Sequence, residues 1–310
     1  MKKIILLLSA AFLVLPSCRK TDTSGVADFD EIAFTTRAAE AETRGATEVV
    51  TNTLTTFHVA ATTGTSSQTK VWDNGVFSGT PGGTFTGGKF WPSESVSWNF
   101  YAANSQIAFA ASGSTVTVKN CNEDIVADYL EGATYKASNA LTFKHILSQI
   151  GTVRMKAPEG YAVTGLKVTV KPVCSGTYNL KKIAGSTPAA KAEGWTRGSA
   201  SADVYLVGSA AAGVTLPAYP DSYVSSDNDL WLLPGQYQLT ASYTITKGDY
   251  TENAVKHATV TLLQGFNNNL GLPGSNADEP NIPVPDDIAD ILFTVTVTPW
   301  ESTEIPASFN

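Results

Sequence analysis

Histidine spacing gives little sign of chemistry in this chain. His58, His145 and His257 are far apart, and each lies in a strand-like run. None shows the H-E-x-x-H or i, i+4 spacing of a zinc site, and the sequence contains no C-x-x-C or G-x-S-x-G motif. We therefore expect no catalytic residue, and three histidines that serve packing or face solvent.

A glycine-rich run at residues 83–89 matches the G-x4-G-K part of a phosphate-binding loop. Phe90 follows where that loop needs a Ser or Thr hydroxyl for magnesium, and Pro92 stands near the point where a helix should begin. The run therefore favours a glycine-rich hairpin over a nucleotide site, and we expect no cofactor.

Two acidic clusters, at residues 227–229 and 286–287, could offer oxygen ligands to calcium. The glycine and distal glutamate of an EF-hand loop are missing at both places. We interpret both clusters as solvated loop charges and predict no metal site.

The N-terminus has the pattern of an export leader. Lys2 and Lys3 precede an apolar stretch at residues 4–15, which is typical of a signal peptide and too short to span a bilayer. The stretch ends in Leu-Pro-Ser-Cys, which resembles the lipobox of bacterial lipoproteins and makes Cys18 the predicted lipidation site. The alternative is an ordinary signal peptide in which Cys18 occurs at this position by chance.

Composition indicates a folded, acidic body. The 310 residues are 43% hydrophobic and 16% charged, and the length allows two domains. The net charge of −7 disfavours nucleic-acid binding, which needs clustered Lys and Arg. Beyond the leader, Cys121 and Cys174 could oxidise in an exported protein, but we expect them in different domains as unpaired, partly buried thiols.

A short strand is predicted at residues 31–37. Ile32, Phe34 and Thr36 alternate with polar or small residues and share one face. Residues 38–48 break the pattern, and the small, polar composition there is typical of protease-sensitive segments. Arg37 and Arg44 are the basic cleavage points of this region.

The remaining chain has the composition of a β protein. Strict alternation at residues 237–245 and 291–297 predicts antiparallel sheets with one wet face, as in a sandwich. Residues 96–102 alternate too and predict a half-buried strand that contains Trp98, while Asn74 and Gly75 predict a tight turn. We place a domain boundary near residue 138.

One run at this boundary resembles a known family. Residues 141–150, with Phe143, His145 and Leu147 followed by Val153, are similar to the F-x-H-x-L-S-x-I segment of the fimbrillin family, the type V pilins of Bacteroides-like bacteria. The likeness continues in order at residues 161–170, 176–179 and 195–196, and upstream at residues 32–34 and 98–102. It also includes the closing residues 293–300.

The resemblance implies an all-β architecture of two transthyretin-like antiparallel β-sandwiches in tandem. It divides the chain into a signal peptide (1–17), a propeptide (18–44), and sandwiches at 45–138 and 139–310. It also implies delivery as a lipoprotein to the outer membrane, through the lipid on Cys18, and cleavage by an Arg-specific protease. We carry the cut over to Arg44, with Arg37 as second choice.

Cleavage would remove the strand that carries Ile32 and Phe34, and the open groove would accept a strand from another subunit. Head-to-tail joining of this kind yields a filament, because it does not close on itself. The candidate donor strand carries Ile291, Phe293, Val295 and Val297. The same segment could instead be a permanent strand of the second sandwich, which would suit a tip or accessory subunit.

Two functions therefore compete. The first is a non-enzymatic structural or adhesive pilin, located first at the outer membrane and then in a surface fimbrium. The second is a surface lipoprotein that binds a glycan or a host protein as a monomer. A hydrolase has no supporting signature in the sequence.

Overall fold

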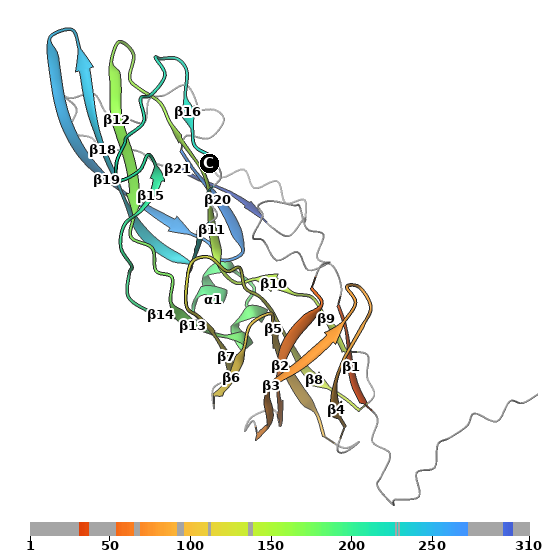
Figure 1. The fold of residues 1–310 in the computed structure, drawn as a ribbon. Coiled ribbons are helices and arrows are strands. Elements are labelled where there is room, and N and C mark those ends of the chain that lie inside the picture. Colours follow the sequence, from red (N-terminus) through yellow and green to blue (C-terminus); the bar gives the residue numbers. More distant parts are fainter. Residues whose placement is uncertain are drawn as a thin grey trace, which may run out of the picture.

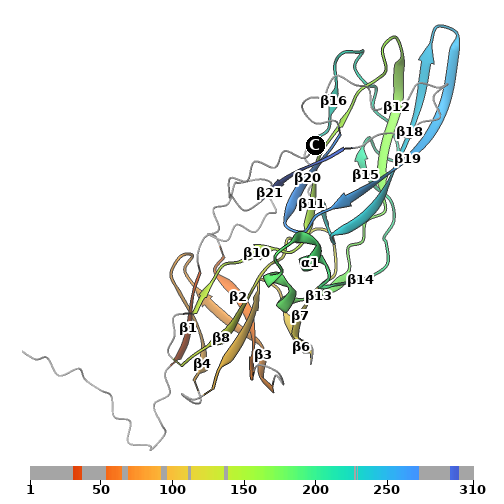
Figure 2. The ribbon, with the colours of Figure 1, turned by 180° about the vertical axis from the view of Figure 1, so that it is seen from behind.

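The structure is a computed structural model that describes residues 31–36, 54–64, 69–91, 96–110, 113–135, 139–226, 228, 230–271 and 294–299. These residues form an almost entirely β protein with several sheets, which confirms the predicted all-β class. The molecule is elongated, with β1 to β5 at one end and the β18–β19 hairpin at the other (Figures 1 and 2). No helix in the described part of the chain is long and apolar enough to cross a membrane.

An eight-stranded sheet with the order β10-β8-β5-β2-β3-β4-β1-β9 builds the first end. Only Thr142 and Phe143 separate the two outermost strands, β9 and β10, along the chain, so the sheet curves until its edges approach each other. The strands are β1 (Glu31–Thr36), β2 (Thr56–Thr63), β3 (Thr69–Gly79), β4 (Thr84–Phe90), β5 (Trp98–Ala103), β8 (Val126–Ala133), β9 (Asn139–Leu141) and β10 (Lys144–His145).

Strand β5 is buried on both faces, so the prediction of a half-buried strand was wrong. Trp98 and Phe100 point into the core enclosed by the curved sheet. Tyr101 and Ala103 point the other way, into a second core that includes Val116. The alternation of residues along the strand could not show this, because a second layer covers the face that carries Tyr101 and Ala103.

That second layer is a four-stranded sheet with the order β14-β13-β7-β6. It joins strands from both sides of residue 138, namely β6 (Ile107–Ala110), β7 (Gly113–Val118), β13 (Gly176–Asn179) and β14 (Trp195–Arg197). Two short helices, η1 (Leu180–Ala184) and α1 (Pro188–Ala192), connect β13 to β14. The predicted domain boundary stays a prediction.

The pairing of β7 with β13 also brings two cysteines together. Cys121 and Cys174 form a disulfide with their Cα atoms 4.8 Å apart, so the expectation of two unpaired thiols was wrong. Val118 of β7 lies opposite Gly176 of β13 in the antiparallel ladder. Cys121 follows Val118 and Cys174 precedes Gly176, each by a few residues, so the two cysteines lie at the same end of the ladder. Sequence separation gave no hint of this register.

The other end contains a four-stranded antiparallel sheet, β15-β12-β18-β19, packed on a sheet built around β11 and β20. In β18, Tyr237, Leu239, Ala241, Tyr243 and Ile245 are all buried and alternate with more exposed residues, as predicted. The strands are β11 (Ser148–Met155), β12 (Ala162–Val170), β15 (Val204–Val207), β16 (Tyr223–Val224), β17 (Leu230–Leu232), β18 (Gly235–Lys247), β19 (Tyr250–Leu262), β20 (Phe266–Gly271) and β21 (Thr294–Pro299).

Asn74 and Gly75 lie inside β3 rather than in the predicted tight turn. Asn74 takes a positive φ of 54°, and the ladder with β2 shifts register between Val59 and Ala61. The side-chain oxygen of Asn74 accepts a hydrogen bond of 3.0 Å from the backbone N–H of Ile107. Asn-Gly therefore forms a bulge here, which its tolerance of positive φ also permits.

Candidate functional site

The candidate site is the place in the sheet that β1 occupies, which we call the seat of β1. The predicted strand is present there, at Glu31–Thr36. It lies between β4, to which it is antiparallel, and β9, to which it is parallel. Phe34 stands opposite Phe85 on one side and Asn139 on the other. Backbone pairing on both sides makes β1 an internal strand of the sheet (Figures 1 and 2).

One face of β1 points into the core of the curved sheet. Ile32 and Phe34 are both 0% exposed, and Thr36 is buried beside them, which confirms the predicted face. Burial of each apolar side chain is worth about 1.5–3 kcal/mol. Together they contribute several kcal/mol to keeping β1 in place.

Phe34 is at the centre of an aromatic cluster. Its ring centroid lies 4.9 Å from that of Phe77, 5.0 Å from that of Phe100 and 6.1 Å from that of Phe57, each in an edge-to-face arrangement. These rings come from three different strands, β2, β3 and β5. The position of Phe34 is therefore an aromatic pocket that specifies a large, flat side chain.

Three polar contacts fix the register of β1. The Glu31 carboxylate accepts a 2.8 Å hydrogen bond from the backbone N–H of Gly88, which sits in a bulge with a φ of 62°. The Asn139 side chain donates a 3.1 Å hydrogen bond to the Ala33 carbonyl. The Thr36 hydroxyl accepts one of 3.3 Å from the backbone N–H of Gly82.

The glycine-rich run of residues 83–89 is therefore the wall of this seat and contains no phosphate-binding helix. It forms most of β4, which continues the β3–β4 hairpin and pairs along β1. The glycine-rich hairpin was predicted from the residue pattern, whereas the roles of Gly88 and Asn139 were not. Neither residue carried a signal, because both contacts depend on a register across more than 50 residues of chain.

The position of β1 in the chain determines what its loss would do. It is the first described strand, and the rest of its sheet begins with β2 at Thr56. A single cut between them would release β1 without breaking any other strand of the sheet. The vacated groove would expose the edges of β4 and β9 and an apolar floor, which together are the requirements of a strand acceptor.

The candidate donor strand is only partly described. Val295 and Val297 lie in β21, which runs antiparallel to β20 and pairs with Leu270 and Asn268 of the same chain. Ile291 and Phe293 lie outside the described residues, as do Cys18, Arg37, Arg44, Trp300, and the acidic residues 227, 229, 286 and 287.

The histidines do not converge. His145 in β10 is 8% exposed, and its Nδ1 lies 2.8 Å from a carboxylate oxygen of the fully buried Asp124. His58 belongs to β2, and Nδ1 of His257 in β19 lies 3.1 Å from the Thr240 hydroxyl. Within the described residues, no group of three or more His, Cys, Asp or Glu side chains is placed to hold a metal ion.

Several solved structures of bacterial proteins are similar to this chain. A protein from Bacteroides ovatus, proposed to act in cell adhesion, aligns with a TM-score of 0.46 and 11% identity over 89% of this chain and 99% of its own. A second such protein, from Bacteroides eggerthii, gives 0.40 and 12% over 88% and 97%. A fimbrial assembly protein from Parabacteroides distasonis gives 0.35 and 11% over 80% and 93%.

Curated proteins give no match to the chain. A sequence profile of the fimbrillin-like family, in contrast, matches residues 36–300, which is most of the chain and includes both ends of the fold described above. The chain therefore belongs to the fimbrillin-like family, which places it among the structural proteins of cell-surface fimbriae rather than among the enzymes.

Proposed function

We propose that the protein is a fimbrial subunit that is kept inactive by β1 and activated when β1 is cut away. The observation that carries the proposal is the position of β1, a first strand inserted between β4 and β9 with Ile32 and Phe34 fully buried. An Arg-specific protease cuts after Arg44, or after Arg37, and separates β1 from the rest of the sheet. A strand of another pilin subunit then fills the groove.

Lipidation and cleavage act together in this proposal. Acyl chains on Cys18 hold the precursor at the outer membrane, since two or more chains give stable anchoring. Cys18 and β1 both precede the cleavage point, so one cut removes the membrane anchor and opens the groove. Assembly therefore follows delivery to the surface.

The seat defines the donor that it accepts. An incoming strand has to run antiparallel to β4, place apolar side chains two residues apart in the sites of Ile32 and Phe34, and offer an aromatic ring at the second. Residues 291–294 read Ile-Leu-Phe-Thr, and residues 32–35 read Ile-Ala-Phe-Thr. This shared pattern supports residues 291–297 of a neighbouring subunit, with Ile291 and Phe293 as plugs, as the donor.

The pairing of β21 with β20 sets a condition on that role. Val295 and Val297 already belong to a strand that is paired within the chain, so donation requires β21 to leave β20. A subunit that keeps β21 in place accepts a strand and donates none, which suits a terminal position in a fimbrium. The two cases differ in whether removal of residues 291–310 from the subunit stops the fimbrium from growing.

A reversible lock on β1 tests the proposal. Thr35 and Thr84 lie opposite each other in the β1–β4 ladder and face away from the buried side, so Thr35→Cys with Thr84→Cys allows a disulfide across the pair. Trypsin treatment of the locked protein is expected to cut the chain yet leave β1 bound and the protein monomeric. Mild reductant then releases β1 and permits SDS-resistant multimers.

Wild-type protein given the same reductant controls for any effect on the native disulfide, and each single cysteine variant controls for substitution at its site. Arg37→Gln with Arg44→Gln should remain intact and monomeric under limited digestion. Multimers that form while β1 is locked would refute the proposal. A clipped, unlocked protein that loses β1 and remains a folded monomer would instead support the monomeric surface lipoprotein.

A further inference from the structure

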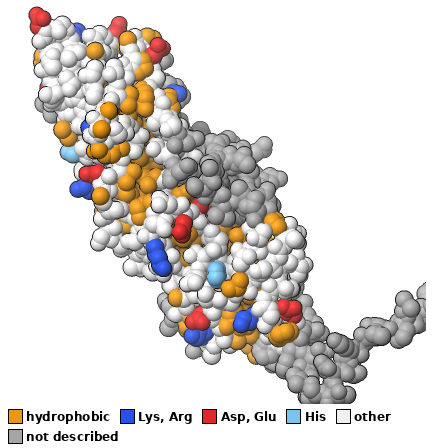
Figure 3. All heavy atoms as spheres, in the orientation of Figure 1, with side chains coloured by type: hydrophobic (Ala, Val, Ile, Leu, Met, Phe, Trp, Pro, Cys, Tyr) orange, Lys and Arg blue, Asp and Glu red, His pale blue; other side chains and the backbone are white. Residues whose placement is uncertain are grey.

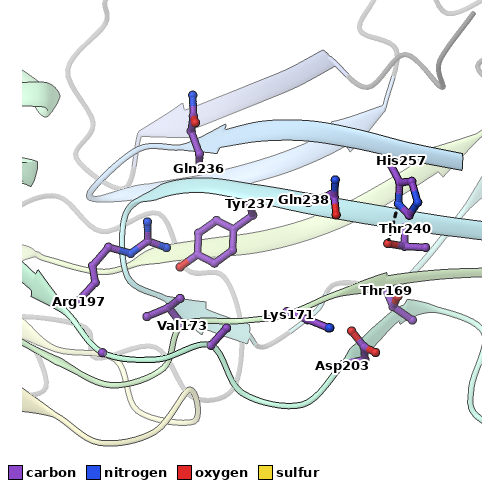
Figure 4. A pocket seen from close by; sticks show the side chains of 12 residues that line it. Thr169, Lys171, Val173, Arg197, Asp203, Gln236, Tyr237, Gln238, Thr240 and His257 are labelled. Atoms are coloured by element: carbon purple, nitrogen blue, oxygen red, sulfur yellow. Dashed lines mark hydrogen bonds between the residues drawn. The ribbon is translucent and has the colours of Figure 1, made fainter.

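A cavity lies against the sheet β15-β12-β18-β19, beside the first half of β18 and near β14. It has a volume of about 620 Å³ and is bordered by β12, β14, β18, β19 and the loops beside them (Figure 4). Gln236, Gln238 and Thr240 line it and alternate along β18 with the core residues Tyr237 and Leu239. Its volume is within the range of small-molecule sites.

Two cations face this cavity in an otherwise acidic protein. Arg197 and Lys171 are both exposed, and neither forms an ion pair with an acidic side chain among the described residues. Asp203 is the one acidic residue of the lining. The charged side chains of the cavity therefore leave one positive charge, on a chain whose net charge is −7.

Arg197 is held in place before any ligand arrives. Its guanidinium carbon lies 4.9 Å above the ring of Tyr237, whose hydroxyl donates a 2.5 Å hydrogen bond to the Leu233 carbonyl. Gly235 makes room for it, because a Cβ at that position would lie 2.4 Å from a guanidinium nitrogen. Packing on one side orders the guanidinium, so less side-chain entropy is lost when a carboxylate binds it.

Several other lining side chains are neutral and can form hydrogen bonds, alongside the apolar Val173, Ala200 and the ring of Tyr237. The amides of Gln236 and Gln238 can both donate and accept, and so can the hydroxyls of Thr169 and Thr240. The Thr240 hydroxyl lies 3.1 Å from Nδ1 of His257, which orients it (Figure 4). Such groups around one ordered cation match a ligand that has several hydroxyls and one acidic group.

We infer that this cavity binds a carboxylate-bearing saccharide, with the carboxylate on Arg197 and the ring hydroxyls toward Gln238 and Thr240. The planar guanidinium matches a carboxylate with two parallel hydrogen bonds. The Asp203 carboxylate would repel a doubly charged phosphate but accepts from a sugar hydroxyl. The apolar lining consists of Val173, Ala200 and the ring of Tyr237, which Arg197 covers, so it offers little to anchor an extended peptide.

Titration of the whole protein with sialyllactose and with lactose, followed by NMR, tests the inference. Sialyllactose should shift the amide signals of residues 236–240 and 257 and bind at least about tenfold more tightly than neutral lactose, since a charge-assisted pair adds that factor or more. Arg197→Gln should remove this preference. Lys119→Ala, which removes an exposed cation outside the cavity, should retain it.

Several outcomes would overturn the inference. They are no shift with either sugar, equal binding of lactose, an unchanged preference in Arg197→Gln, equal loss in Lys119→Ala, and tighter binding of triglutamate, which would indicate an acidic peptide. If Arg197→Gln proves unfolded by circular dichroism, Lys171→Ala replaces it, because that side chain is exposed and supplies the second cation. Lys171→Ala should weaken sialyllactose binding and leave lactose binding unchanged.

Discussion

Phe34→Ala in the uncut precursor is the sharpest test of how β1 is held. The side chain is 0% exposed, and its ring meets those of Phe57, Phe77 and Phe100 at centroid distances of 6.1, 4.9 and 5.0 Å. Truncation loses the burial of the ring and leaves a cavity that three rigid rings close poorly. Substitutions of this kind cost about 3–5 kcal/mol.

This loss of stability should appear in the first unfolding transition that heating or urea produces. Each kcal/mol lost lowers the thermal unfolding midpoint of a domain of this size by about 2–4 °C. The midpoint of Phe34→Ala is therefore expected to fall by about 6–20 °C. Phe90→Ala provides the matched control, because Phe90 lies in the adjacent strand β4 and is 49% exposed. Its cost should stay near the 0.5 kcal/mol that is usual for surface changes.

A Phe34→Ala protein that is no less stable than Phe90→Ala would refute the buried position of β1. The cleaved proteins add a second condition. Once β1 has left, wild type and Phe34→Ala are the same molecule and should unfold at the same midpoint. A difference that persists after cleavage and purification would mean that β1 remains bound and that cutting alone does not open the groove.

Two other predictions concern stability. Cys174→Ser breaks the disulfide with Cys121 and should cost about 2–4 kcal/mol, measured by urea unfolding against the oxidised wild type, because the bond closes a long loop of 53 residues' separation. Burial raises the pKa of Tyr178 to about 12, and burial with the nearby Glu252 raises that of Tyr243 to about 12. The folded state then holds these protons more tightly than the unfolded state, so the contribution of these two residues to stability should be constant below about pH 10 and fall between about pH 10 and 12. Tyrosinate absorbance should show these two residues titrating later than exposed tyrosines, and a stability that does not change across this window would contradict the burial.

The surface gives some context for the proposed roles. On the face in Figure 3, acidic and basic side chains of the described residues occur singly or in small groups, without one basic patch. Exposed apolar residues such as Val255, at 60%, and Tyr250, at 43%, lie on the edge strand β19.

Local residue patterns predicted the strands that bury only one face against a core. The period-2 alternation in β18 and in β1 is a property of the strand itself, so the faces of Tyr237 to Ile245 and of Ile32 and Phe34 could be predicted from spacing. The pattern failed in β5, where a second layer buries Tyr101 on the opposite face from Trp98 and Phe100. It also failed at Asn74, where dipeptide identity could not distinguish a turn from a bulge within a strand.

The sequence by itself determined the β class, the family likeness and the two side chains that plug the curved sheet, because periodicity and residue type are local. Only the tertiary structure decided the neighbours of β1, the hydrogen bonds from Gly88 and Asn139, the disulfide, and the cavity around Arg197. Each of these depends on the register between strands far apart in the chain, and register is set by the packing of the whole sheet rather than by any one segment.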